Sequence, residues 1–178
     1  MQKKIEIARK IAEKVHFEPN NKYPEGQKDK KGFPYMSHIN DIAKRVAHLG
    51  EEYEIVGLLH DSIEDAHDEE ARNEIEDLIK SNFNDNIIDA VYAMTKTSDE
   101  DYFLNYLPRL KKNEIALKVK IADSSHNLSK AHLFENEPEL QSKLRNKYIK
   151  VLNELGIDGA SCEKPIIYCD QDGKWIEK

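Results

Sequence analysis

The chain has 178 residues, of which 39% are hydrophobic and 34% are charged, a composition typical of one globular domain that buries a core without disulfide bonds. The formal net charge of −7 disfavours a nucleic-acid polymer as partner, because a phosphate backbone attracts basic surfaces. Cys162 and Cys169 are the only cysteines, which indicates a reducing compartment, and there is no signal peptide or bilayer-spanning apolar stretch. We therefore expect a single cytoplasmic domain over residues 1–178, with no membrane partner.

The N-terminal third of the chain predicts two helices separated by a loop. The first helix has apolar residues at helical spacing, namely Ile5, Ala8, Ala12 and Val15. Residues 18–34 are rich in Pro, Gly, Asn and Lys and predict the loop. The segment SHINDIAKRVAHLG then predicts a helix with Ser37 as its N-cap, His38 in its first turn and Gly50 as its stop.

Helical patterns continue through most of the remaining chain. A third helix begins near Glu51 and is expected to carry the motif GLLHDSIEDA, and three further helices are predicted from the segments DEEARNEIEDLIKSNF, DNIIDAVYAMT and NEIALKVKIADSSHNLSKAHL. Pro108 interrupts the helical pattern around it, whereas Pro138 begins a last helix that ends at Gly156. Two short β-favouring runs flank residues 170–173 and predict a hairpin. The predicted fold class is therefore all-α with a short C-terminal β-hairpin.

The stretch GLLHDSIEDAHDEE places polar side chains directly behind an apolar run. Four of them fall within an arc of about 140° on the expected helix, namely His60, Asp61, Glu64 and Asp65. A solvated helix face is the ordinary alternative, but such a face mixes acids with Lys and Arg, and this one has no cation. Like charges on one face repel unless a cation neutralises them, so the motif indicates a metal site. The adjoining residues 67–70 lack an apolar lead-in and are expected to be solvated.

A metal site needs more ligands than one histidine and one aspartate, and two other segments offer them. His38 stands at a helix start, and Asp123 follows an apolar helical run. Asn127 lies four residues after Asp123, on the same helical face. Taken singly, these are an ordinary helix-start histidine and an ordinary surface acid, and only their combination with the first motif favours a metal.

Four motifs in this order carry a family resemblance: GFPYMSH, VGLLHDSIEDA, MTK and VKIADSSHN. They resemble the HD-domain metal-dependent phosphohydrolases, and within them the (p)ppGpp hydrolase domains of RelA/SpoT-type proteins and their small stand-alone relatives. The resemblance runs from about Ile5 to Leu133 and leaves the C-terminal helix and hairpin, residues 137–178, outside it. It implies an HD-domain helical bundle and an enzyme similar to a guanosine-3′,5′-bis(diphosphate) 3′-diphosphatase.

The resemblance also implies roles for individual residues. The implied ligands of a divalent ion are His38, His60, Asp61 and Asp123. Mn²⁺ is the usual metal of this family, and nitrogen and oxygen donors also suit Fe²⁺, Co²⁺ or Zn²⁺. Glu64 and Asp65 match the acidic pair that orients or activates the attacking water, and Asn127 matches a substrate contact. A divalent ion would lower the pKa of water toward about 7 and neutralise phosphate oxygens, as phosphate-ester hydrolysis requires.

The loop over residues 18–34 supplies positive charge in an otherwise acidic protein. Lys28, Lys30 and Lys31 are candidates to screen the phosphates of a substrate, and a solvated loop explains them equally well.

The chain departs from the family at three positions. Asp29 stands where the alarmone hydrolases have an arginine that packs on the guanine base, and Ser124 stands where the family usually has arginine. The family also has a histidine shortly before the position of Gln27, whereas His16 lies eleven residues upstream of it, so this loop is enlarged. The first expectation is therefore a metal-dependent phosphohydrolase of a small nucleotide or phosphorylated substrate, with (p)ppGpp-like guanosine 3′-pyrophosphates as the substrate to try first.

Two alternatives stay open at this stage. One is an HD nucleotidase or nucleotide pyrophosphohydrolase with another base specificity, which the acid at position 29 favours. The other is a catalytically silent module that binds a metal or a nucleotide. The sequence predicts no oligomeric state.

Overall fold

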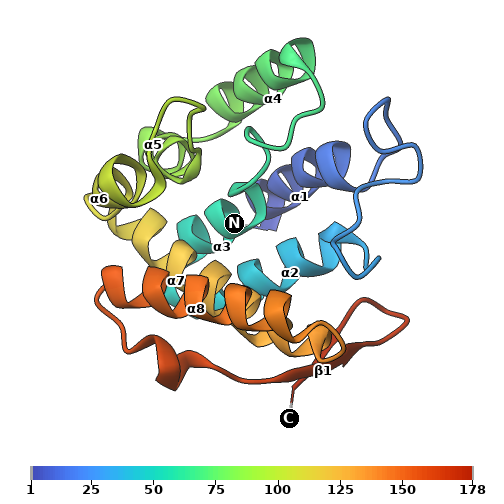
Figure 1. The fold of residues 1–178 in the computed structure, drawn as a ribbon. Helices are drawn as coiled ribbons and strands as arrows, with labels where there is room; N and C mark the ends of the chain where they lie inside the picture. The colour runs from blue at the N-terminus through green and yellow to red at the C-terminus, as the bar shows by residue number, and fades with distance from the viewer. Residues whose placement is uncertain (1, 178) are drawn as a thin grey trace.

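The computed structural model describes residues 2–177, apart from the side chains of residues 167 and 168. Its longer elements are α1 (Gln2–His16), α2 (Tyr35–Val46), α3 (Glu51–Leu59), α4 (Glu69–Asn82), α5 (Asp85–Met94), α6 (Leu107–Leu110), α7 (Glu114–Lys130), α8 (Pro138–Glu154), β1 (Ile166–Cys169) and β2 (Trp175–Glu177). Figure 1 shows these helices packed together, with α8 alongside α7 and the C-terminal segment running past α8. The predicted all-α class is confirmed.

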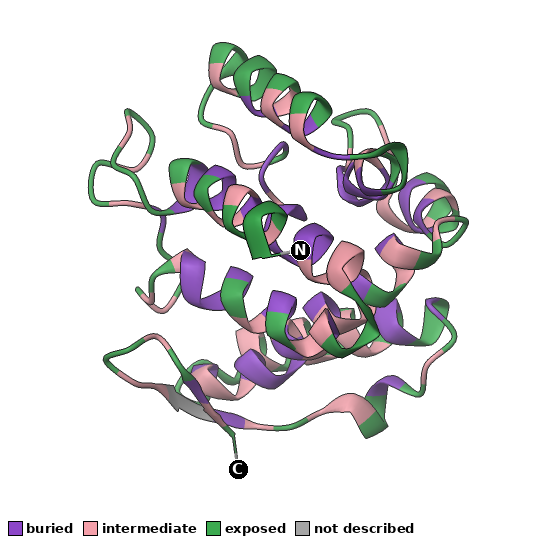
Figure 2. Ribbon diagram, turned by 180° about the vertical axis from the view of Figure 1, so that it is seen from behind, coloured by how far each residue is buried: buried purple, intermediate pink, exposed green. Residues whose placement is uncertain are grey.

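The helices α2, α3 and α7 form the centre of the molecule. The helix α3 packs against α2, α1, α7 and α5, and α7 in turn packs against α2 and α8. The apolar stripes face inward, because Ile39 and Ile42 of α2 and Leu58 and Leu59 of α3 are fully buried. Figure 2 shows this arrangement, with buried residues on the sides of helices that face one another and exposed residues on their outer sides.

A glycine allows α2 and α3 to approach each other closely. A Cβ atom added at Gly57 would lie 2.8 Å from the Cα of Ala43 and 3.2 Å from Cγ2 of Val46. This contact brings the N-terminal turn of α2 and the C-terminal end of α3 to the same region of the fold.

Two local expectations are wrong. Ser37 is not the N-cap of α2, because Pro34 holds that position and the helix begins at Tyr35; proline has no N–H to leave unsatisfied at a helix start. The helix α3 ends at Leu59, so it does not carry the whole polar motif, and the residues after His60 continue as turns. Those turns are tight, since the backbone N–H of Asp65 still donates to the carbonyl of Asp61 at 2.9 Å.

The remaining expectations about elements are confirmed. The chain before Pro108 is irregular, with a π-helical turn over Tyr102–Tyr106 ahead of α6. The strands β1 and β2 pair antiparallel around a turn at residues 170–173, where Gly173 has φ 75°. None of the helices over residues 2–177 combines the length and apolar character that crossing a bilayer requires.

Candidate metal and substrate site

The structure brings the four predicted ligands together from three elements. His38 lies in the first turn of α2, His60 follows the last residue of α3, and Asp123 lies in α7. Ligand atoms of His38, His60 and Asp61 lie within 4.8 Å of one another. Asp123 adjoins this group, because its Oδ1 is 3.3 Å from Nε2 of His38. The resulting donor set is two imidazoles and two carboxylates.

One buried atom of this cluster lacks a partner. The Nδ1 of His60 donates to the carbonyl of Gly57 at 2.8 Å. Its Nε2 is buried without a well-formed hydrogen bond, although Oδ2 of Asp61 lies 3.1 Å away. Leaving a buried ring nitrogen unpaired costs free energy, and a cation would satisfy it. The donor types therefore fit a divalent metal that accepts nitrogen and oxygen ligands.

Neighbouring side chains orient the two carboxylates. The hydroxyl of Tyr35 donates to Oδ2 of Asp61 at 2.7 Å. Lys120 Nζ donates to Oδ2 of Asp123 at 2.9 Å, and the amide of Asn127 donates to Oδ1 of the same residue at 2.7 Å. Such outer contacts fix the direction of ligand oxygens in metal sites.

Burial and neighbouring charges shift the pKa values in the cluster. Burial raises the pKa of Asp123, but the charge of Lys120 and contact with His38 outweigh it and the pKa falls well below its usual value. Burial lowers the pKa of His60, but the carboxylate of Asp61 more than offsets this and the pKa is about 9. For His38 burial prevails, and its pKa is lowered. At neutral pH the two carboxylates are therefore ionised, the form that binds a cation, and a cation would displace the second proton of His60.

The predicted catalytic pair Glu64 and Asp65 lies beside the cluster, outside the group of three ligands. Asp65 Oδ2 accepts a hydrogen bond from the amide of Gln27 at 2.8 Å, and Glu64 Oε2 accepts one from the backbone N–H of Lys96 at 3.0 Å. Burial and the charge of Asp61 raise the pKa of Asp65 to about 6. The pKa of Glu64 is also raised, mainly by burial. Carboxylates with raised pKa values are better proton acceptors near neutral pH.

The enlarged loop closes back onto this region. His16 and Gln27 are eleven residues apart, yet Nδ1 of His16 lies 2.6 Å from Oε1 of Gln27. Because the amide of Gln27 also reaches Asp65, the loop connects the end of α1 to the acidic pair.

A pocket of about 380 Å³ adjoins the cluster of histidines and aspartates. Its lining residues are Lys28, Asp29, Lys30, Lys31, Tyr35, Asn127, Lys130, Ala131, Phe134, Leu144, Lys147 and Tyr148. Tyr35 and Asn127 belong both to this wall and to the contacts of the ligand carboxylates, so the pocket and the cluster are continuous. The four residues predicted to bind substrate, including the three loop lysines, all lie in this wall.

The lysines of the pocket differ in how their charge is balanced. Lys28 pairs with Glu25 at 2.8 Å, and Lys31 pairs with Glu137 at 3.3 Å. Over the described part of the chain, no carboxylate lies within ion-pair distance of Lys147, whose Nζ instead lies 5.0 Å from the ring centroid of Tyr148. A ligand with negative charge would complement this wall.

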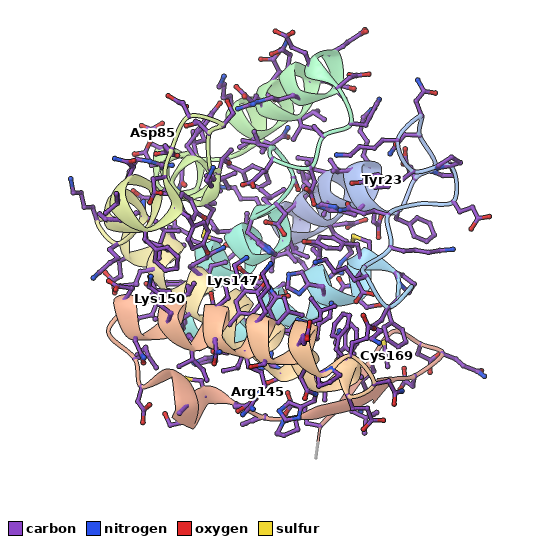
Figure 3. All side chains as sticks on the ribbon, viewed as in Figure 1. Tyr23, Asp85, Arg145, Lys147, Lys150 and Cys169 are labelled. Carbon is purple, nitrogen blue, oxygen red and sulfur yellow. The ribbon has the colours of Figure 1, made fainter. Side chains whose placement is uncertain are left out.

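Sequence reasoning missed the pocket residues of α8. Figure 3 shows Lys147 on the side of α8 toward the middle of the molecule and Arg145 on the side toward the C-terminal segment, where it bonds Glu163. The amphipathic pattern of α8 predicts a helix but not which neighbour it covers. No signal in the sequence alone connects Lys147 or Tyr148 to the distant loop lysines.

Asp29 is held by its own loop and by α7. Its carboxylate accepts hydrogen bonds from the backbone N–H groups of Lys31 and Phe33 at 2.8 and 3.1 Å, and it pairs with Lys130 Nζ at 2.5 Å. The acid thus shapes the loop at the edge of the pocket.

Comparison with known proteins gives one distant relationship. No family model matches the chain. A GTP pyrophosphokinase of Streptomyces coelicolor is 26% identical over 168 residues, which is 88% of this chain and 18% of the relative. The chain therefore spans less than a fifth of the length of that protein, and it is similar to one section of it.

Proposed function

We propose that the protein is a metal-dependent phosphohydrolase of the HD type that acts on a small nucleotide, with (p)ppGpp-like guanosine 3′-pyrophosphates as the leading substrates. The observation that carries the proposal is the buried cluster of two histidines and two aspartates, with the unpartnered Nε2 of His60, beside a lysine-lined pocket. The name of the distant relative, a GTP pyrophosphokinase, supports a guanine nucleotide and a pyrophosphate group.

In this proposal His38, His60, Asp61 and Asp123 hold a divalent cation, with Mn²⁺ as the first candidate and Fe²⁺, Co²⁺ or Zn²⁺ as others. When bound, such an ion lowers the pKa of water from about 15.7 toward about 7 and neutralises charge on phosphate oxygens. Tyr35, Lys120 and Asn127 orient the carboxylates that would coordinate it.

The other steps belong to side chains of the pocket. Glu64 or Asp65 takes up the proton of the attacking water, since both carboxyl groups have raised pKa values. Lys30 and Lys147 bind phosphate oxygens, because among the described residues neither has a carboxylate within ion-pair distance. With ppGpp, the reaction breaks the ester bond at the 3′ oxygen, releases pyrophosphate and leaves guanosine 5′-diphosphate with a free 3′-hydroxyl.

A second candidate is a nucleotide pyrophosphohydrolase with another base preference. Asp29 favours it, because this carboxylate is already bound by Lys130 and by the loop backbone and has no flat cationic surface on which guanine could stack. The two candidates share the metal site and differ only in the base that the pocket accepts.

A release assay separates these candidates. Mn²⁺-loaded protein is incubated with ppGpp, GTP, dNTPs and nucleoside monophosphates, and phosphate and pyrophosphate are measured. We expect pyrophosphate from ppGpp at the highest rate, and turnover preferring another nucleotide would favour the second candidate. Binding without any turnover across a metal series would instead indicate a silent nucleotide-binding module.

The two His-Asp pairs of the chain supply a matched control. We expect His60→Ala to lower the rate by more than about 100-fold, because it removes a ligand of the ion. His67→Ala should leave the rate unchanged, because His67 is exposed and, among the described residues, forms an ion pair only with Asp68. Full activity of the His60→Ala variant would show that the assigned site is wrong.

A further inference from the structure

Two buried histidines, His38 and His126, meet behind the metal cluster. Their Nδ1 atoms lie 2.7 Å apart, and their ring planes are 24° from parallel. A contact this short between two ring nitrogens is a hydrogen bond, in which one Nδ1 carries the proton and the other offers its lone pair. The pair therefore has two possible arrangements, which differ in the direction of this bond.

The two arrangements have opposite consequences for a cation. Nε2 of His38 faces Oδ1 of Asp123 at 3.3 Å, at the edge of the cluster. If His126 donates, a neutral His38 accepts at Nδ1 and carries its own proton on Nε2, where it has no lone pair to offer. If His38 donates from Nδ1, its Nε2 has the lone pair that coordination requires. Without a cation, the carboxylate of Asp123 attracts a proton to Nε2 of His38, and a cation bound between the two removes that attraction.

Asp41 favours the arrangement in which His38 donates. When His126 accepts at Nδ1, its proton is on Nε2, and Nε2 lies 3.7 Å from Oδ2 of Asp41. This separation is longer than a hydrogen bond, but the charge of the carboxylate still attracts an N–H and repels a lone pair. Arg45 fixes that oxygen in place by donating to it from Nε at 2.5 Å, although its own positive charge offsets part of the attraction.

His60 needs no such help. Its Nδ1 donates to the carbonyl of Gly57, and a carbonyl can only accept, so His60 keeps its proton on Nδ1 when a cation replaces the proton on Nε2. The partner of His38 is another imidazole, which can either donate or accept. A third group is therefore required to choose the direction of the bond at His38.

We propose that, with a cation bound, His126 is a positioning residue that accepts the Nδ1 proton of His38 and leaves the Nε2 lone pair for the cation, and that Asp41 favours this direction of the hydrogen bond. The inference rests on the metal site of the proposed function and is independent of which nucleotide is turned over.

The C-terminal hairpin packs against the pair formed by His38 and His126. The ring of Trp175 lies 5.1 Å from that of His126, edge to face, and its Nε1 donates to the carbonyl of Ser37 at 3.1 Å. Ser37 directly precedes His38, so one side chain of β2 contacts His126 and the residue next to His38. This gives the hairpin a part in positioning the site.

Nuclear magnetic resonance of the unaltered protein loaded with Zn²⁺, which is diamagnetic, tests the tautomer directly. Long-range ¹H–¹⁵N spectra of the imidazoles distinguish a protonated Nδ1 from a protonated Nε2. We expect His38 to carry its proton on Nδ1 and His126 on Nε2. Protonation of His38 on Nε2, with His126 donating, would overturn the inference.

Titration with Co²⁺ tests the consequence for affinity. We expect His126→Leu to weaken Co²⁺ binding by about 10- to 100-fold, because His38 loses the acceptor for its Nδ1 proton. His126→Gln should recover most of that loss, because its amide oxygen can accept the same hydrogen bond. Asp41→Asn should weaken binding several-fold, because the neutral amide no longer favours the Nε2 proton of His126.

His132→Leu is the matched control, since His132 pairs with Glu163 away from the cluster and its loss should leave Co²⁺ affinity unchanged. Equal Co²⁺ affinity of His126→Leu and the unaltered protein would overturn the inference, as would an equal loss in the Leu and Gln variants. If the His126→Leu variant does not fold, the tautomer spectra of the unaltered protein still show which histidine of the pair donates the hydrogen bond. A protein that binds Co²⁺ with the expected tautomer but hydrolyses no nucleotide would contradict the proposed function and support this inference.

Discussion

Single atoms within the core decide what the site can hold. The free Nε2 of His60 and the hydrogen-bonded carboxylates of Asp61 and Asp123 would be costly in an apolar interior without a cation. The sequence pointed to these residues, because a histidine and several acids without a basic partner are unusual behind an apolar run. It did not indicate His126, which is one polar residue within a helical segment and becomes informative only when its Nδ1 is found beside His38.

His16 should make folding stability depend on pH. Burial lowers its pKa to about 4, although its contact with Gln27 acts in the opposite direction. The unfolded chain binds a proton at about pH 6.5 and the folded protein only at about pH 4, so stability is lost as the pH falls between these values. The loss attributable to this residue reaches about 3 kcal/mol at most.

Urea unfolding at pH 7, 5.5 and 4.5 measures this dependence. The His16→Gln variant should lose less stability than the unaltered protein over that range, whereas His67→Gln, at an exposed position, should follow the unaltered protein. The same pH dependence in the His16→Gln variant would contradict the assignment.

Among the elements, the contact between α2 and α3 has the greatest effect on the site. It sets the distance between the helix start that carries His38 and the helix end that carries His60, and Gly57 lies at the point of closest approach. The periodicity of both helices was predictable from their apolar residues. The end of α3 at Leu59 was not, because the polar motif continues the helical spacing although the backbone turns away.

Gly57→Ala should destabilise the protein although alanine is the better helix former. Its Cβ would lie 2.8 Å from the backbone of Ala43, and moving the helices apart should cost about 1–3 kcal/mol, against a gain of about 1 kcal/mol from helix propensity. Asn73→Ala on the exposed face of α4 is the control and should change stability by a few tenths of a kcal/mol in the favourable direction.

Chemical denaturation measures both variants, and Mn²⁺ affinity should fall in the Gly57→Ala variant alone. A Gly57→Ala protein that is more stable than the unaltered chain would show that the two helices are not held this closely.

Across the whole molecule, the site is assembled from segments far apart in the chain. Residues of α2, of the turn after α3 and of α7 form the cluster of histidines and aspartates, while the loop after α1, the end of α7 and the helix α8 form the pocket wall. Local patterns predicted most helices, the hairpin and the ligand candidates. They could not predict that Lys147 of α8 faces Lys30 across one pocket, or that Trp175 packs on His126, because nothing in local sequence encodes which distant surfaces meet.

The placement of a metal ion tests the central claim most directly. Crystals of the protein equilibrated with Mn²⁺ are measured at the manganese absorption edge, where the ion gives an anomalous peak. The account predicts one strong peak between His38, His60, Asp61 and Asp123, at coordination distance from His60 Nε2, and no such peak in crystals of the His60→Ala variant. The absence of a peak at this position in the unaltered protein, with Mn²⁺ in excess, would contradict the account.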